Sequence, residues 1–384
     1  MHSTLSDLRV AIVHYWLTTM RGGEKVLEAL CDIFPQADIF THVVSPGELS
    51  PALRSHAIHT TFIQKLPGSV RHYQRYLPLM PLALEQLDLR AYDLVLSSES
   101  GPAKGVVTRA ETPHICYCHS PMRYLWDAYP DYLASADIVT RLGMRLLFPR
   151  LRQWDYISAQ RVDAIVANSS AVQRRIRRWW GRDSVVIHPP VDVERFARPD
   201  MTLLPHGMTA RSYYLCLGEL VCYKRIDLAV EACNAGGLPL VIAGDGPEKA
   251  RLQRLAGPTI RFLGRVDDAL VPPLLAGCKA FLLPGQEDFG ITPVEAMAAG
   301  RPVVAFRAGG ALDTVIDGKT GRFFTGQSPR ALLDALKAFE SEGDHWSAET
   351  LRAHAATFSH RAFRRAMLDV ILETLDGVAP PRTD

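Results

Sequence analysis

Two glutamates at a fixed spacing are the most distinctive candidates for ligand-binding chemistry in this sequence. Seven residues separate Glu287 from Glu295, and Phe-Gly-Ile-Thr-Pro lies between them at 289–293. The apolar run 280–283 predicts a buried strand, so we expect Glu287 in a loop at the carboxyl end of that strand, where open α/β sheets bind ligands. Each glutamate also has an ordinary interpretation: Glu287 as a solvated loop acid, and Glu295 as half of a helix capping box.

A helix is predicted to begin between the two glutamates. Thr292, Pro293 and Glu295 have the order typical of an N-cap, a first helical residue and a third helical residue. Gly300 and Pro302 are expected to end the helix before the next apolar run. The unpaired N–H groups and partial positive charge of such a helix N-terminus favour an anion. The segment therefore predicts an anion site in the loop.

The Glu-x7-Glu segment resembles the nucleotide-sugar site of family 4 glycosyltransferases, which are retaining enzymes of the GT-B fold. The resemblance implies an α/β chain with two Rossmann-like domains that face each other across a cleft. It also implies that Glu287 binds hydroxyl groups of the donor sugar and that Glu295 binds the ribose. The same resemblance implies that Phe289 belongs to the donor-binding loop and that the backbone at Arg265 and Val266 borders the base.

Sugar transfer from a nucleotide diphosphate develops negative charge on the leaving phosphate, which fixed cations and N–H donors stabilise. The resemblance implies that Lys224 contacts the diphosphate, and that His119, Lys224 and Glu287 are the catalytic residues. The family often has an arginine five residues before this lysine, where this sequence has Glu219. Two alternatives could supply the positive charge of the missing arginine: the side chain of Arg225, or the backbone amides of Gly290, Ile291 and Thr292.

A glycine pair follows the first predicted strand, the apolar run 8–14. A dinucleotide fingerprint would need G-x-G-x-x-G and an acid about 20 residues further on. Only Gly22 and Gly23 are present, which disfavours an NAD-binding domain. Glycines do let a diphosphate approach the backbone closely, and the resemblance implies that this pair faces the phosphates of the donor from the other side of the cleft.

A histidine stands directly after another predicted strand, at 113–118. A lone histidine is most often structural, but the position of His119 at a strand end, beside a Ser-Pro pair, favours a role in the site. The segment 119–126 resembles the acceptor-facing loop of mannosyltransferase-like members of the family. This implies that His119 lies next to the sugar ring, and that Arg123 and Trp126 border the acceptor path.

Strands and helices that could position these residues alternate along both halves of the chain. Apolar runs predict parallel strands at 37–41, 94–97, 113–118 and 162–168, and again at 213–218, 238–243 and 260–263. Prolines and a polar tract before Asp200 predict a hinge between the halves. We expect an N-terminal acceptor-side domain over 1–192, a nucleotide-sugar-binding domain over 193–357, and a final helix within 358–384 that crosses back to the first domain, as is common in this fold class.

Basic and apolar residues are concentrated in the stretch 141–178, where nine arginines accompany two acids, Asp155 and Asp163. The interleaved apolar residues are Leu146, Leu147, Phe148, Trp179 and Trp180. This pattern favours peripheral contact with an anionic membrane, with a solvated basic face as the alternative. Nucleic acid is not expected, because no nucleic-acid motif accompanies the patch. The segment 62–89 predicts either a helix in the core or a surface that meets lipid head groups.

The composition is that of an ordinary globular protein. The chain has 384 residues, 47% of them hydrophobic and 22% charged, with a net charge of +2. Its seven cysteines lie mostly in apolar runs, which predicts reduced core thiols and a cytosolic protein. We expect no signal peptide, no transmembrane helix and no metal, since no Asp-x-Asp pair occurs at a predicted strand end. The predicted location is the cytoplasm, at the inner face of the cell membrane.

The resemblance and the residues that carry it predict a retaining hexosyltransferase. The first candidate for its donor is GDP-mannose, and its acceptor would be lipid-linked or a polysaccharide, in cell-surface glycan synthesis. Three alternatives share the architecture: a UDP-sugar-dependent transferase of the same family, a GT-B nucleotide-sugar epimerase, and a non-catalytic partner that binds sugar nucleotides.

Overall fold

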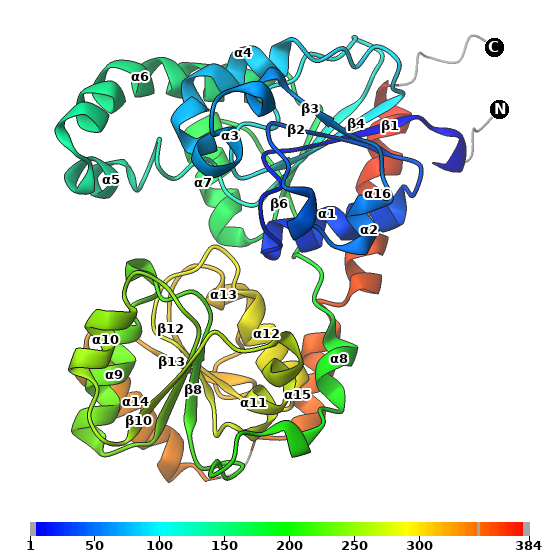
Figure 1. Ribbon diagram of the computed structural model, residues 1–384. Helices are drawn as coiled ribbons and strands as arrows, with labels where there is room; N and C mark the ends of the chain where they lie inside the picture. Colours follow the sequence, from blue (N-terminus) through cyan, green and yellow to red (C-terminus); the bar gives the residue numbers. More distant parts are fainter. Residues whose placement is uncertain (1–4, 344–345, 379–384) are drawn as a thin grey trace. The chain divides into compact units, whose positions relative to one another are not determined.

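The computed structural model describes residues 5–343 and 346–378 (Figure 1). They form two compact units. The first unit runs to His188 and includes the final segment from Phe363, and the second unit spans Pro189–Ala362. Each unit has one parallel sheet with helices packed against it, so each is described by itself.

The first unit is built on a seven-stranded sheet in the order β3-β2-β1-β4-β5-β6-β7. All neighbouring strands in it are parallel. The strands are β1 (Val10–His14), β2 (Asp38–Thr41), β3 (Ile58–Thr60), β4 (Leu94–Glu99), β5 (His114–Cys118), β6 (Ala164–Ala167) and β7 (Val185–Val186). The chain runs outward from β1 to β3 and then returns to the centre for β4, so the strand order reverses between β1 and β4. Open α/β sheets bind ligands at the carboxyl ends of strands beside such a reversal.

Both faces of this sheet are buried in hydrophobic clusters. Successive side chains of a strand point to opposite faces, so neighbouring residues enter different clusters. Val10 and Ile12 pack into one hydrophobic cluster and Ala11 and Val13 into another. The helices of the unit are α1 (Gly22–Ile33), α2 (Pro51–Arg54), α3 (Ser69–His72), α4 (Met80–Glu85), α5 (Tyr129–Ser135), α6 (Ile138–Gln160), α7 (Ser170–Trp180) and α16 (His360–Val378).

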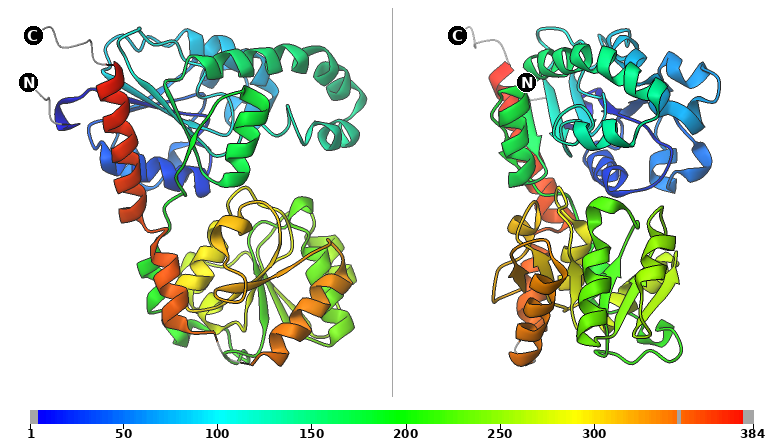
Figure 2. Two further views of the ribbon diagram at one scale, coloured as in Figure 1. Left: turned by 180° about the vertical axis from the view of Figure 1, so that it is seen from behind. Right: turned by 90° about the vertical axis from the view of Figure 1, so that its left-hand side faces the viewer.

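The final helix α16 packs in the first unit. Phe363, Met367 and Ile371 recur every fourth residue and are buried in the same cluster as β1 and α1. The guanidinium of Arg364 donates to the carbonyl of Asp32 in α1 at 2.8 Å. Figures 1 and 2 show α16, in red, alongside the first unit. Residues from both ends of the chain therefore complete one core.

The segment 62–89 is not one helix. It consists of η3 (Phe62–Lys65), α3, η4 (Tyr73–Leu79) and α4 in succession. Pro78 lies inside η4 and a second proline lies in the first turn of α4, and each interrupts a longer helix because it lacks the N–H that a helix interior needs. Met80, Ala83 and Leu84 are buried, whereas Leu79 and Leu82 are exposed. The segment therefore covers the core as short pieces.

The arginine-rich stretch forms most of α6, then β6 and α7. Trp180 at the end of α7 is fully buried, so the interpretation of Trp180 as a membrane-facing residue is wrong. Several arginines are engaged internally: Arg152 donates to the carbonyl of Leu125, and Arg161 pairs with Glu85 at 3.0 Å. In Figures 1 and 2, α5 and the start of α6 project as an arm from the body of the first unit. None of the helices in the described ranges is long and apolar enough to cross a membrane.

The second unit is built on a six-stranded parallel sheet in the order β10-β9-β8-β11-β12-β13. The strands are β8 (Tyr214–Leu217), β9 (Leu240–Ala243), β10 (Ile260–Gly264), β11 (Phe281–Leu283), β12 (Val303–Phe306) and β13 (Gly321–Phe324). The helices are α8 (Val193–Ala197), α9 (Ile226–Gly236), α10 (Lys249–Leu255), α11 (Val271–Gly277), α12 (Ile291–Ala298), α13 (Ala311–Thr314), α14 (Pro329–Ser341) and α15 (Ala348–Ala356). Here the strand order reverses between β8 and β11.

Candidate functional site

In the second unit, the loops that follow β8 and β11 bring a cation and a carboxylate together. Lys224 comes after β8 and Glu287 after β11, so both lie beside the reversal of strand order. Lys224 Nζ lies 3.2 Å from Glu287 Oε1, with side-chain exposures of 18% and 21%. Burial opposes ionisation of Lys224, but the carboxylate of Glu287 raises the pKa of Lys224 above its ordinary value. The pair is therefore charged and still reachable by a ligand.

Glycines allow these two loops to approach each other. A Cβ on Gly285 would overlap the backbone of Tyr223 and Lys224, and a Cβ on Gly218 would lie 2.8 Å from Lys224 Nζ. At Gly285 only a residue without a side chain fits, because real Cβ atoms do not approach backbone atoms so closely. Gly218 has φ +131°, a conformation that residues with a side chain rarely adopt. The short distance between Lys224 and Glu287 therefore depends on backbone contact.

The helix after Glu287 begins two residues earlier than the capping pattern predicts. α12 spans Ile291–Ala298 with Gly290 as its N-cap, so the assignment of Thr292 as N-cap is wrong. Gly290 has φ +86°, a conformation that glycine adopts without strain, and it therefore turns the chain into the helix before Thr292 is reached. Pro293 becomes the third helical residue, where its missing N–H is still one of the unpaired donors of the first turn. Gly290 also lies beside the carboxylate of Glu287, since a Cβ there would be 3.7 Å from Oε2.

The sequence interpretation missed a second glycine pair at this site. Gly309 and Gly310 follow β12, and the amide of Gly310 donates to the carbonyl of Glu287 at 2.9 Å. A Cβ on Gly309 would overlap that carbonyl, and a Cβ on Gly310 would overlap the backbone of Phe289. The glycine pair therefore packs directly against the backbone of the Glu287 loop and holds it by a hydrogen bond. A Gly-Gly pair shortly after an apolar run was the available signal.

The other predicted donor-binding residues of the second unit lie in α12 or follow β8 and β10. Glu295 is buried in α12, and Arg265 and Val266 follow the carboxyl end of β10. Arg225 has φ +50° and its guanidinium pairs with Asp227 at 3.2 Å. Arg225 is therefore directed at Asp227, which leaves Lys224 and the amides at the start of α12 as the positive groups beside Glu287.

In the first unit, the predicted glycine pair and histidine lie together. Gly22 and Gly23 open α1 after β1, and His119 follows β5. A Cβ on Gly23 would lie 3.7 Å from His119 Nε2 and would overlap the hydroxyl of Tyr15. Burial and, to a smaller extent, His14 lower the pKa of His119 to about 3. The imidazole is therefore neutral at physiological pH.

Three polar residues behind His119 were missed by the sequence interpretation. His14 is the last residue of β1, and Ser98 is the last residue but one of β4. Glu24 lies in the first turn of α1. All three are buried, and Ser98 Oγ lies 2.9 Å from His119 Nε2 and 3.0 Å from His14 Nδ1. A polar residue at the end of an otherwise apolar strand run was the signal for His14 and Ser98.

Arg123 and Trp126 lie in the loop after His119, and both have protein partners. Arg123 Nε lies 3.5 Å from Asp127 Oδ2. The indole of Trp126 donates to Asp155 at 2.7 Å and stacks on Trp179 with ring centroids 5.0 Å apart. Trp126 thus ties its loop to α6 and α7.

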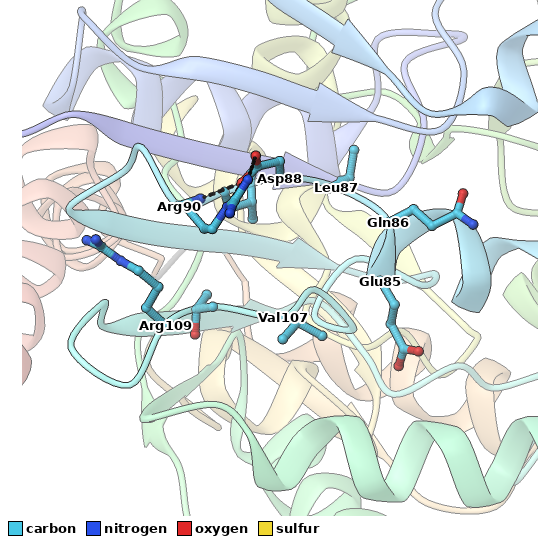
Figure 3. A pocket seen from close by; sticks show the side chains of 9 residues that line it. Glu85, Gln86, Leu87, Asp88, Arg90, Val107 and Arg109 are labelled. Atoms are coloured by element: carbon cyan, nitrogen blue, oxygen red, sulfur yellow. Dashed lines mark hydrogen bonds and ion pairs between the residues drawn. The ribbon is translucent and has the colours of Figure 1, made fainter.

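A surface depression of about 430 Å³ lies elsewhere on the first unit (Figure 3). It is lined by 85–90 and 107–109, which lead toward the amino ends of β4 and β5. In Figure 3, Asp88 is paired with Arg90 at this depression. None of the predicted site residues lines it. Within the part of the chain that the structure describes, no group of three or more His, Cys, Asp or Glu side chains could hold a metal ion.

Comparison with known proteins shows two family matches that lie end to end. Residues 20–195 match the family described as Glycosyltransferase Family 4, and residues 208–356 match Glycosyl transferases group 1. The chain is 30% identical over 222 residues to the GDP-mannose-dependent alpha-(1-6)-phosphatidylinositol dimannoside mannosyltransferase of Mycobacterium tuberculosis, which covers 55% of this chain and 58% of that protein. It is 28% identical over 251 residues to the lipopolysaccharide core biosynthesis mannosyltransferase LpsB of Rhizobium meliloti, covering 59% and 70%. The chain thus matches little more than half the length of the first of these relatives.

Solved structures share the whole architecture at low sequence identity. HepE of Anabaena in complex with UDP and glucose superposes with a TM-score of 0.72 at 18% identity, covering 95% of this chain and 99% of that chain. Sucrose-phosphate synthase of Thermosynechococcus elongatus gives a TM-score of 0.69 at 17% identity, covering 96% and 100%. These likenesses confirm the predicted fold with two Rossmann-like sheets. From the two family matches and this shared architecture, the chain belongs to glycosyltransferase family 4 and has the GT-B fold.

Proposed function

We propose that this protein is a retaining glycosyltransferase that moves a sugar from a nucleotide diphosphate to a lipid-linked or polysaccharide acceptor, with GDP-mannose as the first donor to test. The observation that carries the proposal is the Lys224–Glu287 pair, 3.2 Å apart beside the start of α12. The names of the relatives from Mycobacterium and Rhizobium support mannose, and the first names GDP-mannose. A relative from Pseudomonas aeruginosa is named a D-rhamnosyltransferase, so the donor panel includes other sugars.

Each part of the site has a distinct task in this chemistry. When the donor binds, the Lys224 ammonium exchanges Glu287 for the diphosphate, and Glu287 turns to the hydroxyl groups of the sugar. As the bond from the sugar to the phosphate breaks, Lys224 and the N–H groups at the start of α12 stabilise the charge that develops on the leaving phosphate. The close contacts at Gly285, Gly309 and Gly310 keep these groups fixed before the donor arrives.

The test is release of nucleotide diphosphate from a panel of GDP-, UDP- and ADP-sugars, with a membrane extract as acceptor. We expect Lys224→Ala and Glu287→Ala each to lower turnover at least a hundredfold, because loss of one such group typically costs about 3–4 kcal/mol of transition-state stabilisation. The matched control is Lys279→Ala, which breaks another Lys–Glu pair of the same unit, 2.7 Å from Glu340 and before β11. Near-normal turnover in folded Lys224→Ala or Glu287→Ala would remove the assignment.

The same assay separates the alternative functions. A nucleotide-sugar epimerase or hydrolase-like protein would consume the donor without an acceptor. A non-catalytic partner would bind the donor in calorimetry and release no nucleotide diphosphate. A UDP-sugar-dependent transferase would be identified by the base preference in the panel.

For the acceptor side, we propose that the arm formed by α5 and α6 docks on an anionic membrane. Ile138, Leu142 and Leu146 recur every fourth residue on α6 and are 82%, 59% and 65% exposed. The one acid of α6 is Asp155, which is fully buried, whereas Arg145 and Arg150 are exposed on the same helix. An exposed apolar row with adjacent arginines matches the apolar and anionic layers of a lipid surface.

Vesicle flotation tests the arm. We expect binding to vesicles with anionic lipid that weakens with salt, and loss of this binding in the triple variant Ile138→Ser, Leu142→Ser, Leu146→Ser. The control replaces exposed Leu255 and Leu312 of the second unit by serine and should float like the original protein. Equal flotation of the triple variant, or no flotation of the original protein, would overturn the proposal.

A further inference from the structure

The loop that carries Glu287 has a single side chain that can anchor it in the core. Residues 284–290 read Pro-Gly-Gln-Glu-Asp-Phe-Gly, so Phe289 is the only large apolar residue among them. Its side chain is 3% exposed and belongs to the hydrophobic core of the second unit. The glycines at 285, 290, 309 and 310 have no side chain to add to this anchorage. The position of the loop therefore depends on what the ring of Phe289 contacts.

Phe289 packs against an aromatic residue that lies just after α15. The ring centroids of Phe289 and Phe358 are 5.8 Å apart, with an angle of 55° between the ring planes. Phe358 is 5% exposed and lies in the same core. Aromatic pairs at this separation contribute stabilisation beyond the area that they bury. The anchor of the Glu287 loop thus rests on a residue from the last part of the chain.

The position of Phe358 is fixed by backbone contacts that do not involve the loop. Its amide donates to the carbonyl of Ala355 at 3.0 Å, and its carbonyl accepts from the amide of Val191 at 2.9 Å. Val191 also forms an isolated parallel bridge with Ser359. The second unit begins shortly before Val191 and ends shortly after Ser359, at Ala362. The segments by which the chain enters and leaves this unit are therefore joined to each other at Phe358.

A second contact from the end of α15 supports the loop by another route. His354 lies in the last turn of α15, and its ring contacts that of Phe358 edge-on, with centroids 5.3 Å apart. His354 Nε2 donates to the carbonyl of Thr314 at 2.8 Å, because a carbonyl can only accept. Thr314 is the last residue of α13, whose N-cap Gly310 donates to the carbonyl of Glu287. The end of α15 therefore reaches the loop through a ring contact and also through α13.

We infer that Phe358 is a positioning residue for the donor: it holds the Glu287 loop through the ring of Phe289 and ties this loop to the segments by which the chain enters and leaves the second unit. The inference rests on the proposed function for the identity of the ligand. The support of the loop depends only on contacts within the second unit. Because Phe358 acts through Phe289, its effect on the donor must shrink once Phe289 has been changed.

The first test needs no ligand. Hydrogen exchange of the intact protein, read by mass spectrometry, reports how often the loop opens. Peptides over 284–290 should exchange about tenfold faster in Phe358→Leu, which removes the ring, because an aromatic pair is worth up to about a factor of ten. The control is Phe339→Leu, since Phe339 is buried in the same core and stacks on Trp346 with centroids 5.7 Å apart. Unchanged exchange in Phe358→Leu, or equal acceleration in the two variants, would overturn the inference.

The second test is a double-mutant cycle on donor affinity, with GDP-mannose and UDP-glucose as probes and calorimetric titration as the measurement. Phe289→Leu and Phe358→Leu should each weaken binding about fivefold, and the double variant about five- to tenfold, against about 25-fold for independent effects. Phe339→Leu should alter Kd less than about twofold, with or without Phe289→Leu. Independent effects of Phe289→Leu and Phe358→Leu would overturn the positioning role.

Two further variants of Phe358 distinguish positioning from general stability. Phe358→Tyr keeps the ring and should bind the donor within about twofold of the original protein. Phe358→Met removes the ring but fills irregular space, so it takes the place of Phe358→Leu should the leucine variant fail to fold. A purely structural role would lower the urea midpoint in Phe358→Leu and Phe339→Leu alike and leave Kd unchanged in both, which would contradict the inference.

The two tests separate two kinds of failure. If loop exchange rises only in Phe358→Leu and no member of the donor panel binds, the proposed function fails while the support of the loop stands. If the donor is bound and turned over equally by the original protein and Phe358→Leu, the positioning role is overturned and the proposed function stands.

Discussion

Three fully buried ionisable residues of the first unit form a cluster in which Lys104 pairs with both Glu99 and Asp155. Lys104 Nζ lies 3.3 Å from Glu99 Oε1 and also contacts Asp155. Burial opposes the charge of Lys104, but Asp155 and Glu99 raise its pKa above the ordinary value. The indoles of Trp126 and Trp180 donate to Asp155 at 2.7 and 2.8 Å. The lysine is thus the counter-ion on which two buried acids depend.

Lys104→Met should therefore destabilise the first unit by about 3–5 kcal/mol, because it leaves buried carboxylates without a counter-ion. The urea midpoint, followed by circular dichroism, measures the change. Arg90→Ala removes an exposed ion pair with Asp88 and should leave the midpoint nearly unchanged. A midpoint for Lys104→Met equal to that of Arg90→Ala would contradict the role assigned to the lysine.

Two buried histidines make stability depend on pH. Burial lowers the pKa of His42 to about 4 and that of His114 to about 3, against about 6.5 in an unfolded chain. Between these values the unfolded chain binds more protons than the folded chain, so their stabilising effect is complete above about pH 6.5 and is lost as the pH falls toward 4 and then 3. At pH 5 each histidine should cost about 2 kcal/mol.

Urea midpoints at pH 7.5 and pH 5.0 check this dependence. His42→Gln cannot take up a proton, so it should lose less stability between the two pH values than the original protein does. The same loss in both proteins would exclude His42 as a source of the effect.

At the scale of elements, the Glu287 loop is held by contacts between backbones. Gly310 has an ordinary helical conformation, so its substitution causes no backbone strain, but a Cβ there would overlap the backbone of Phe289. Gly310→Ala should displace the loop 287–290 and weaken donor binding at least tenfold, with about 1–3 kcal/mol lost from stability. Calorimetric titration with the donor measures the first effect. Gly47→Ala, where a Cβ would meet nothing within 4 Å, should bind the donor normally.

The sequence predicts most of the strands, and the reason is physical; β3 and β13, which lie at sheet edges, were not predicted. Parallel strands that are buried on both faces are short apolar runs, and polar residues directly after such runs fall at the carboxyl edge of the sheet. His119 was singled out by such a position. Lys224 and Glu287 were singled out through the family resemblance. Thr292 was assigned wrongly because the positive φ of Gly290 starts the helix earlier, and no periodicity reveals that conformation. Gly309 and Gly310 escaped because their role depends on the backbone of another loop. Ser98 and His14 escaped because their contact joins strands that are 84 residues apart.

At the scale of the molecule, α16 completes the core of the first unit. Met367 and Ile371 are buried against residues of β1 and α1, more than 300 positions earlier in the chain. Met367→Ala and Ile371→Ala should each cost the first unit about 2–5 kcal/mol, because each opens a cavity in its core. Leu372→Ala alters a side chain that is 48% exposed on the same helix and should be nearly neutral.

Hydrogen exchange read by mass spectrometry can locate the effect of these substitutions. Peptides from β1, β4 and α1 should exchange faster in Met367→Ala and Ile371→Ala, and peptides from β8, β11 and α12 should not. Equal acceleration in both sets would mean that the two units unfold as one.

Because α16 follows the whole second unit in the chain, the first unit cannot finish its core while the ribosome is still translating residues 189–362. At about 5–20 residues per second, that interval lasts roughly ten to thirty-five seconds. During it, the apolar faces of β1 and α1 that α16 covers are open to chaperones and proteases. A premature stop codon in the second half would thus release a chain whose first unit lacks α16. Chaperones and proteases would then recognise the exposed apolar residues of β1 and α1, which lie far from the stop in the sequence.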